Sequence, residues 1–351
     1  MRKLSFTTLL IIAFALACTS AGAAFADGTV KGKASIEIKE RLYRIEKAGK
    51  FGFINGKGKI VIEPKYNQVA HMAGNPVYVV SDGKQIYYDA DGSKLFECPL
   101  NRCGLLSEGM VVYQEKVKTE DGALKTRFGY LNDKGEKVTE PIFHYASHFA
   151  DGMARVNVGK ASGYIDKTGK LVIPYRFSST SDFSEGRAVV QLQADGKYAY
   201  IDKTGKVLTP AMYAHAGRFS DGAAHVYVNG KYGYIDRNGN MFLEPQFSAA
   251  WEFSEGLAAV ERNGKTFYIN KQGKKVIFIG GGQFSDGLAP AFKGQETGYI
   301  DRTGKFAIQP KFVWGDVFIG ELAMVYIKSE KTEIGFVEGY INRMGQIVWT
   351  P

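Results

Sequence analysis

The residues of this chain that could do chemistry are mainly carboxylates, and they recur at equivalent places. A four-residue phrase of Phe, Ser or Ala, an acidic residue and Gly positions them at Asp151, Glu185, Asp221, Glu255 and Asp286. A row of carboxylates could bind Ca²⁺ or a cationic polymer. Catalysis, however, needs unlike residues that converge at one place. We therefore interpret these carboxylates as turn residues that are solvated.

Few other groups qualify as a reaction centre. Glu321 and Glu338, in the irregular last repeat, are weak candidates for the two facing carboxylates of a polymer hydrolase. His144 and His148 are four residues apart between expected strands, without the further ligands that a metal needs. No nucleophile elbow, P-loop or dinucleotide fingerprint occurs in a suitable context. We predict no enzyme activity, no catalytic residue, no cofactor and no metal site.

Two tryptophans are the candidate ligand surface. Trp251 in "WEFSEG" and Trp314 in "KFVWGD" fall in expected loops between repeats, where binding side chains usually lie. Exposed rings there could stack on the sugar rings of a glycan. The alternative is that they fill the seam between neighbouring repeats.

The net charge is +9, of which Arg2 and Lys3 contribute two. A basic surface with aromatic residues can bind single-stranded nucleic acid. Here no run of five or more basic residues exists, and the chain is expected to be exported. We therefore predict no nucleic-acid partner, and a protein or cell-wall glycan partner instead.

The first 26 residues are typical of a secretory signal peptide. They begin with Arg2 and Lys3, continue with an apolar stretch over 9–17, and end in Ala24-Phe25-Ala26, an A-x-A cleavage pattern. Residues 27–40 are then a short linker. Cys18 leaves an alternative open, because "ALAC" resembles a lipoprotein box. Lipidation at Cys18 is the only membrane anchoring that we expect, and the localisation is secreted, periplasmic or cell-envelope associated.

The two remaining cysteines lie close together in "CPLNRC". Cys98 and Cys103 are separated by four residues, whereas a redox motif has two. An even cysteine count in an exported protein favours a disulfide that closes a small loop.

These groups stand on a repeated unit. Its hallmark is an aromatic residue, an aliphatic residue, Asp or Asn, two further residues and Gly, with a period of about 34 residues in the centre of the chain. The copies begin at Phe53, Tyr87, Tyr130, Tyr164, Tyr200, Tyr234, Tyr268, Tyr299 and Tyr340. A period of this length predicts a repeat architecture.

One unit, residues 222–247, predicts three antiparallel strands. "AAHVYV" alternates as a strand does, and Asn229-Gly230 suits a two-residue turn in which both residues have positive φ. "KYGYID" returns, and Gly233 inside it suggests a close approach by another backbone or an aromatic ring. We expect Pro245 to end the third strand, which is then an edge. Such a sheet is marginal alone, so neighbouring units must stack.

The combined phrases resemble the WG-repeat (KWG) family of bacterial proteins over about residues 41–351. The likeness is carried by "KYGYIDRNGN", "KFGFINGKGKIVIEPKY" and "FSEGLAAV". Phe51, Phe128 and Tyr232 stand before Gly where that family has tryptophan. The resemblance implies a β-rich tandem array in exported or cell-associated proteins, usually without a known activity.

Nine three-stranded units fit poorly with propellers of four to eight four-stranded blades. We therefore expect an all-β array of stacked meanders in an open twisted spiral, with a closed propeller-like ring as the alternative. The expected function is non-enzymatic recognition or scaffolding at the bacterial envelope. A cell-wall polymer hydrolase and a purely structural array are the alternatives.

Overall fold

The repeated unit folds as a meander of hairpins. β21 (Ala223–Val228) and β22 (Lys231–Asp236) pair through Asn229 and Gly230, whose φ angles are 50° and 83°. This confirms the predicted two-residue turn. The next turn is held by Asp236 Oδ1, which accepts the backbone N–H groups of Asn238 and Asn240 at 2.8 and 2.9 Å. β23 (Met241–Phe247) follows.

The computed structural model describes residues 41–70, 73–74, 76–100, 102–120, 122–194, 196–277 and 281–351. The predicted signal peptide, the linker and Cys18 lie outside these residues. The described residues belong to one compact unit, Glu37–Pro351. No helix is found among the described residues, and therefore none that could span a membrane.

These residues form nine small antiparallel sheets, here called blades 1 to 9 in chain order. From the inner edge outward, blade 1 contains β5 (Ala73–Gly74), β1 (Leu42–Lys47), β2 (Lys50–Ile54) and β3 (Ile60–Tyr66). Blade 2 contains β4 (Gln68–Ala70), β6 (Val77–Ser81), β7 (Lys84–Tyr88) and β8 (Lys94–Glu97). Blade 3 contains β9 (Cys103–Ser107), β10 (Met110–Lys118), β11 (Leu124–Asn132) and β12 (Lys137–Phe143).

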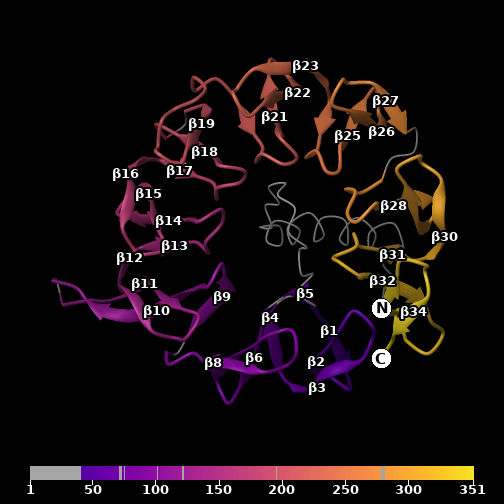
Figure 1. Cartoon of the computed structure of the whole chain (residues 1–351), viewed down its shortest axis with the longest axis horizontal. Coiled ribbons are helices and arrows are strands. Elements are labelled where there is room, and N and C mark those ends of the chain that lie inside the picture. Colours follow the sequence, from indigo (N-terminus) through magenta and orange to yellow (C-terminus); the bar gives the residue numbers. More distant parts are fainter. Residues whose placement is uncertain are drawn as a thin grey trace, which may run out of the picture. The chain divides into compact units, whose positions relative to one another are not determined.

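The later blades repeat this order (Figure 1). Blade 4 contains β13 (Tyr145–Ala146), β14 (Met153–Val158), β15 (Ala161–Asp166) and β16 (Leu171–Phe177), and blade 5 contains β17 (Ser179–Thr180), β18 (Arg187–Gln191) and β19 (Tyr198–Asp202). Blade 6 contains β20 (His215–Ala216), β21, β22 and β23, and blade 7 contains β24 (Ala249–Ala250), β25 (Leu257–Arg262), β26 (Lys265–Asn270) and β27 (Lys275–Ile277). Blade 8 contains β28 (Leu288–Lys293), β29 (Glu296–Asp301) and β30 (Phe306–Phe312), and blade 9 contains β31 (Trp314–Gly315), β32 (Leu322–Lys328), β33 (Phe336–Asn342) and β34 (Ile347–Trp349).

The core lies between blades, not within them. Nine clusters of buried side chains occur, and each joins two neighbouring blades. Between blades 6 and 7, for example, Tyr234 packs edge-on against Phe253 with ring centroids 4.8 Å apart. The Tyr234 hydroxyl donates to the Trp251 carbonyl at 2.7 Å. Each blade therefore depends on its neighbours for burial, as the stacking argument predicts.

The ninth cluster closes the ring. Tyr43 and Ile45 of blade 1 pack with Leu322 and Tyr340 of blade 9, and all four are at most 2% exposed. The Tyr43 hydroxyl donates to the Ile319 carbonyl at 2.6 Å. The described residues are therefore a nine-bladed β-propeller (Figure 1).

The expectation of an open spiral is wrong, and the closed ring given as its alternative is confirmed. An open array would leave the apolar faces of its first and last units in water, and here those faces cover each other. The repeat pattern indicates only three strands in each unit, which favours the spiral. Most blades have a fourth, inner strand, which in blades 4, 6, 7 and 9 is only two residues long.

The repeated glycine allows the outer strand to lie close to the middle one. A Cβ atom added at Gly233 would lie 2.5 Å from the Leu243 carbonyl oxygen, which confirms the predicted close approach. The expected end of the strand at Pro245 is wrong, because β23 continues to Phe247. Proline is tolerated there because β23 is the outer edge, and the register shifts beside it.

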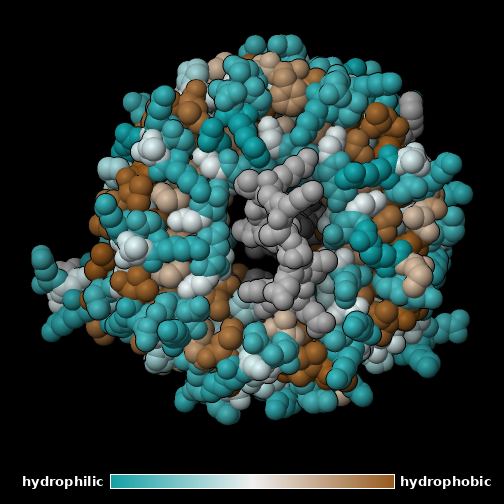
Figure 2. All heavy atoms as spheres, viewed as in Figure 1, coloured by the Kyte–Doolittle hydropathy of each residue, from teal (hydrophilic) through white to brown (hydrophobic). Residues whose placement is uncertain are grey.

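Most of the face seen in Figure 2 is hydrophilic, with hydrophobic side chains scattered over it. The hairpin of β10 and β11 extends outward from the ring (Figure 1). These two strands have nine residues each, and Leu124 at the start of β11 is 66% exposed.

Candidate functional site

The repeated acidic residues join neighbouring blades. Glu185 has a φ of 52° in a two-residue turn, which confirms the turn interpretation. Its carboxylate accepts the backbone N–H of Gly222 in blade 6 at 2.9 Å and pairs with Arg237 of the same blade at 2.9 Å. The Glu185 side chain is only 22% exposed, so the expectation that these carboxylates are simply solvated is wrong.

The same arrangement recurs at consecutive interfaces from blade 3 to blade 9. We call Glu108, Asp151, Glu185, Asp221, Glu255 and Asp286 the inter-blade carboxylates. The backbone N–H groups that they accept belong to Gly152, Gly186, Gly222, Gly256, Gly287 and Gly320. The first five also form ion pairs, with Lys167, Lys203, Arg237, Lys271 and Arg302. These side chains are thus engaged in structure at every interface where they occur.

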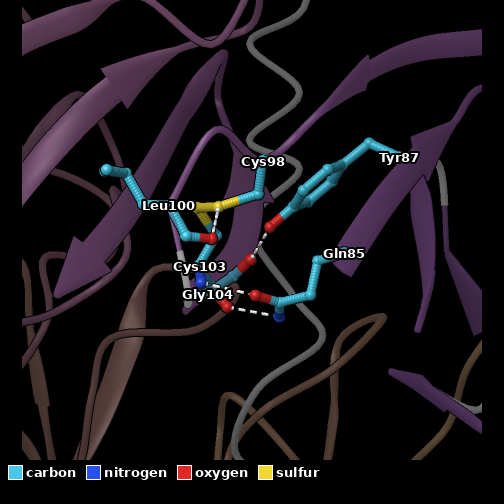
Figure 3. Close-up of a disulfide and its surroundings, with 6 residues drawn as sticks. All are labelled: Gln85, Tyr87, Cys98, Leu100, Cys103 and Gly104. Carbon is cyan, nitrogen blue, oxygen red and sulfur yellow. Dashed lines mark hydrogen bonds between the residues drawn. A yellow bond between two sulfur atoms is a disulfide. The ribbon is translucent and has the colours of Figure 1, made fainter. Parts of the chain in front are cut away.

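A disulfide lies at the interface of blades 2 and 3, where no inter-blade carboxylate is found among the described residues. Cys98 follows β8, and Cys103 begins β9, and the structure joins their sulfur atoms with Cα atoms 6.3 Å apart (Figure 3). The Gln85 side chain donates to the Cys103 carbonyl at 2.6 Å and accepts the Cys103 N–H at 2.5 Å. This interface is therefore held by a covalent loop and a side-chain amide.

The two tryptophans have different surroundings. Trp251 follows β24 of blade 7, and its side chain is 45% exposed. Trp314, in β31 of blade 9, is half-buried with its ring 5.5 Å from that of Tyr326, and it packs against the core cluster between blades 9 and 1. Of the two, only Trp251 is available as an exposed aromatic surface.

The weak hydrolase candidates lie at the interface of blades 9 and 1. Glu338 pairs with Arg44 at 3.0 Å. The side chain of Glu321 lies against Gly56, where an added Cβ would be 3.1 Å from the Glu321 Cβ. Both carboxylates therefore contact blade 1.

His144 and His148, which the sequence places four residues apart, have separate partners. His144 Nδ1 accepts the N–H of Gly159 at 2.7 Å, and His148 Nε2 is 3.6 Å from Asp182. Among the described residues, no three His, Cys, Asp or Glu side chains are grouped as metal ligands.

An open polar cavity of about 230 Å³ lies between blades 4 and 5. Its lining residues are Tyr145, Arg155, Val156, Asn157, Ser162, Ser178, Ser179 and Thr180. Most of these side chains carry a hydroxyl, amide or guanidinium group. The cavity can therefore exchange several hydrogen bonds with a small polar group.

Arg155 is fixed at the edge of this cavity. Its Nη1 donates to the Thr180 carbonyl at 2.7 Å, its Nη2 donates to the Tyr145 hydroxyl at 3.1 Å, and its Nε is 3.0 Å from Asp182. The guanidinium also lies over the Tyr145 ring, 5.2 Å from its centroid. Asp182 compensates the positive charge of the guanidinium. The contacts with Thr180 and Tyr145 fix the orientation in which Arg155 donates hydrogen bonds.

His225 is a second polar residue that breaks the repeat pattern. Its buried ring stacks on His215 with centroids 5.7 Å apart and faces Tyr232 and Tyr234. Burial, and then the proximity of His215, lower the pKa of His225 from 6.5 to about 4. The imidazole is therefore neutral at pH 7, inside blade 6.

The family comparison agrees with this repeated construction. The model for the WG-containing repeat matches residues 51–84, 128–160, 163–198, 198–232, 232–265 and 298–329, which together are more than half of the chain. The chain belongs to the WG-repeat family. No curated protein sequence matches it.

Two of the solved structures that match this WG-repeat protein are distant from it in sequence. One, described as a eukaryotic initiation factor, is 13% identical, with a TM-score of 0.62 over 89% of this chain and 95% of that one. AztD from Citrobacter koseri is 9% identical, with a TM-score of 0.42 over 88% of this chain and 93% of that one. The first likeness concerns the fold alone, and the second supports no argument.

Sequence reasoning missed the inter-blade carboxylates and the cavity of this WG-repeat protein. The signal for the first was present, because a basic residue follows the hallmark Asp or Asn at Lys167, Lys203, Arg237, Lys271 and Arg302. The signal for the second was a departure from the repeat. Arg155 pairs with Tyr164 where the equivalent residues of blades 5 and 7 are Val189 and Ala259.

Proposed function

We propose that this protein is an exported, non-enzymatic scaffold of the bacterial cell envelope whose blade surfaces bind a protein or a cell-wall glycan. The WG repeats and the propeller fold make it a repeat-based binding or scaffold protein. Export, the envelope and the kind of partner are the proposed part. The signal-peptide pattern of residues 1–26 supports export.

One observation carries the proposal: the side chains are constant where blades pack and unlike along the inner edge of the blades. The hallmark Tyr is buried in each of blades 4 to 9. By contrast, the first residue of the inner strand, at one register position, is Tyr145, Ser179, His215, Ala249 or Trp314. A constant framework that displays unlike side chains is suited to recognition at chosen blades.

The contacts of Glu321 and Glu338 support binding over polymer hydrolysis. Glu338 is ion-paired with Arg44, and Glu321 lies against blade 1. A general acid and a general base need access to substrate and to water. Glu321 is exposed, but Glu338 is held by Arg44, so the two do not form a pair of free carboxylates.

The test is site-specific photo-cross-linking in the exporting cell. A photoreactive phenylalanine analogue replaces Trp251, which is 45% exposed, and in a second variant replaces Tyr145, which is 42% exposed. The control replaces Leu124, which is 66% exposed and lies on the outward hairpin. We expect an envelope protein or glycan on at least one of the first two positions and not on the control.

Absence of any cross-linked envelope component at Trp251 and Tyr145 would contradict the proposal. So would turnover of cell-wall polymer by the purified chain. Mass spectrometry of the exported N-terminus separates cleavage before Asp27 from lipidation of Cys18. A chain that stays inside the cell with residues 1–26 attached would contradict the proposed export to the envelope.

A further inference from the structure

We infer that the cavity between blades 4 and 5 is a binding subsite for one neutral sugar ring. This inference rests on the proposed binding function and specifies the chemistry that one part of the surface recognises. It concerns the space between Tyr145, Asn157, Ser162 and Ser179, at the junction of β13, β14, β15 and β17.

The size of the cavity limits its ligand. Its volume of about 230 Å³ is below the range of about 300–1,000 Å³ for drug-sized ligands. It is therefore suited to a single small ring, such as one unit at the end or on the side of a larger polymer. The cavity is open, so the rest of such a polymer can extend over the blade surface.

The charge of the lining excludes a strongly ionic ligand. Arg155 is the only charged side chain in the lining, and Asp182 pairs with its Nε at 3.0 Å. Two further guanidinium bonds go to Thr180 and Tyr145. An anion would find this positive charge already compensated, and a cation would find no free carboxylate in the lining.

Unused hydrogen-bonding groups define what the ligand must offer. Asn157 Oδ1 is buried, and within the described ranges it accepts no hydrogen bond. A buried acceptor without a partner is costly, by about 1–3 kcal/mol. Neither Ser162 nor Ser179 uses its hydroxyl in a hydrogen bond to another described residue. A ligand that both donates and accepts at neighbouring positions satisfies these three groups, and vicinal hydroxyls do so.

The aromatic side chain completes the match to a sugar. Tyr145 is 42% exposed, and the guanidinium of Arg155 lies 5.2 Å from the centroid of its ring. This contact and the bond from Arg155 Nη2 to the hydroxyl fix the orientation of the ring. An oriented aromatic ring beside hydroxyl and amide groups provides an apolar contact for the C–H face of a pyranose.

Blade 7 provides a matched internal control. At the positions equivalent to Ser178, Ser179 and Thr180 it has Ser248, Ala249 and Ala250. Alanine is thus compatible with the inner strand of a blade. Ser179→Ala should leave the fold intact while removing one hydroxyl from the cavity.

The experiment is ligand-observed NMR on the purified full chain. The neutral probes are glucose and N-acetylglucosamine, and the charged probes are glucuronate and inorganic phosphate. We expect weak, saturable binding of at least one neutral sugar. Asn157→Ala and Ser179→Ala should each weaken the binding of the sugar by about tenfold. Each substitution removes one hydrogen bond and leaves a hydroxyl of the bound sugar without a partner. Ser248→Ala should leave it unchanged.

Three results would overturn the inference: no binding of either neutral sugar, tighter binding of glucuronate or phosphate, or equal binding by the Ser179→Ala chain. The unfolding temperature of each variant shows that the comparison is made on folded protein. If cross-linking at Trp251 still identifies an envelope partner while the sugars do not bind, this inference fails and the proposed function stands. If a neutral sugar binds but no envelope partner is found, the sugar subsite stands and the proposed envelope function fails.

Discussion

His225 shows how a single residue can make stability depend on pH. Its pKa is lowered to about 4 in the folded chain, against 6.5 for an unperturbed group, chiefly because burial disfavours the charged imidazolium. Between these two values the unfolded chain binds more protons than the folded one. Stability therefore falls as the pH is lowered from 6.5 to 4, and the full loss is present below pH 4.

Replacing this histidine should remove that part of the pH dependence. The shift from 6.5 to about 4 corresponds to about 3 kcal/mol. Val189 occupies the equivalent position in blade 5, so we choose His225→Val. The free energy of unfolding, measured with denaturant, should fall between pH 7 and pH 4 in both chains. The fall should be smaller in the variant by about 3 kcal/mol. An equal loss in both chains would show that the buried imidazole is not the cause.

An inter-blade carboxylate should contribute more to stability than an ordinary surface one. Glu185→Ala removes the ion pair with Arg237 and leaves the Gly222 N–H without its acceptor. We expect a loss of about 1–3 kcal/mol in the free energy of unfolding, mainly from the unpaired N–H. The matched control is Glu244→Ala, an exposed carboxylate on β23, for which we expect a change within about 0.5 kcal/mol. Equal effects of the two substitutions would contradict the role given to Glu185.

At the scale of the element, the repeated glycine occurs where a carbonyl oxygen of the outer strand lies close to the middle strand. Gly52, Gly163, Gly233 and Gly298 occur in blades whose outer strand has seven residues. The equivalent residue is Ala199 in blade 5, which lacks a regular outer strand, and Phe267 in blade 7, whose β27 has three residues. Blade 9 also has the glycine, Gly339, although its outer strand β34 has only three residues. A Cβ added there would lie 3.0 Å from the Trp349 carbonyl oxygen. The close approach of the outer strand, and not its length, is therefore what requires glycine in these five blades.

Adding one methyl group at this position should separate the outer strand from its blade. In Gly233→Ala the new Cβ would be 2.5 Å from the Leu243 carbonyl oxygen, so β23 must shift. We expect a loss of about 1–3 kcal/mol and faster amide exchange in β22 and β23. The control is Ala199→Gly in blade 5, where no outer strand is displaced. An unchanged rate of amide exchange in β23 would show that an alanine at position 233 does not displace the outer strand.

The disulfide belongs to the element scale because it fixes one interface. Reducing Cys98–Cys103 reopens a loop of six residues, counted from 98 to 103, and the loop-entropy model gives about 2 kcal/mol for its closure. We expect reduction to speed amide exchange in β8 and β9 and to leave blades 6 and 7 unaffected. Uniform acceleration round the ring, or none at all, would contradict a local role.

Much of the blade could be predicted from the sequence, because turns and alternation are local. Asn229-Gly230 and the Asp236 turn specify their conformations through their own side chains, and Gly233 indicated a close contact. The inner strands could not be predicted in this way. A two-residue strand such as β20 has no periodicity, and its pairing with β21 depends on the whole blade.

At the scale of the whole molecule, closure could not be predicted from any single repeat. Blade 1 takes its inner strand, β5, from the connection between β4 and β6, and among the described residues no strand of blade 1 pairs with one of blade 9. The ring is closed by packing of Tyr43 on Tyr340 and by the Arg44–Glu338 pair. These contacts join residues nearly 300 positions apart in the sequence.

The same separation limited the prediction of function. The exposed ring of Trp251 was predicted as a candidate surface from its place in a loop. The cavity beside Arg155 was not, because it combines side chains from two blades that only the packed ring brings together. Recognition at such junctions depends on the inter-blade angle, and therefore on a closed ring.

The most direct test of the closed ring is an engineered disulfide across blades 9 and 1. A Cβ at position 56 would lie 3.1 Å from that of residue 321, close to the spacing of about 3.5–4.5 Å that a disulfide needs. The double variant Gly56→Cys, Glu321→Cys is made together with Cys18→Ser and analysed by peptide mapping without reduction. We predict an intramolecular bond between residues 56 and 321 in the monomer. Free thiols at both positions, or a bond formed only between separate chains, would contradict the closed ring.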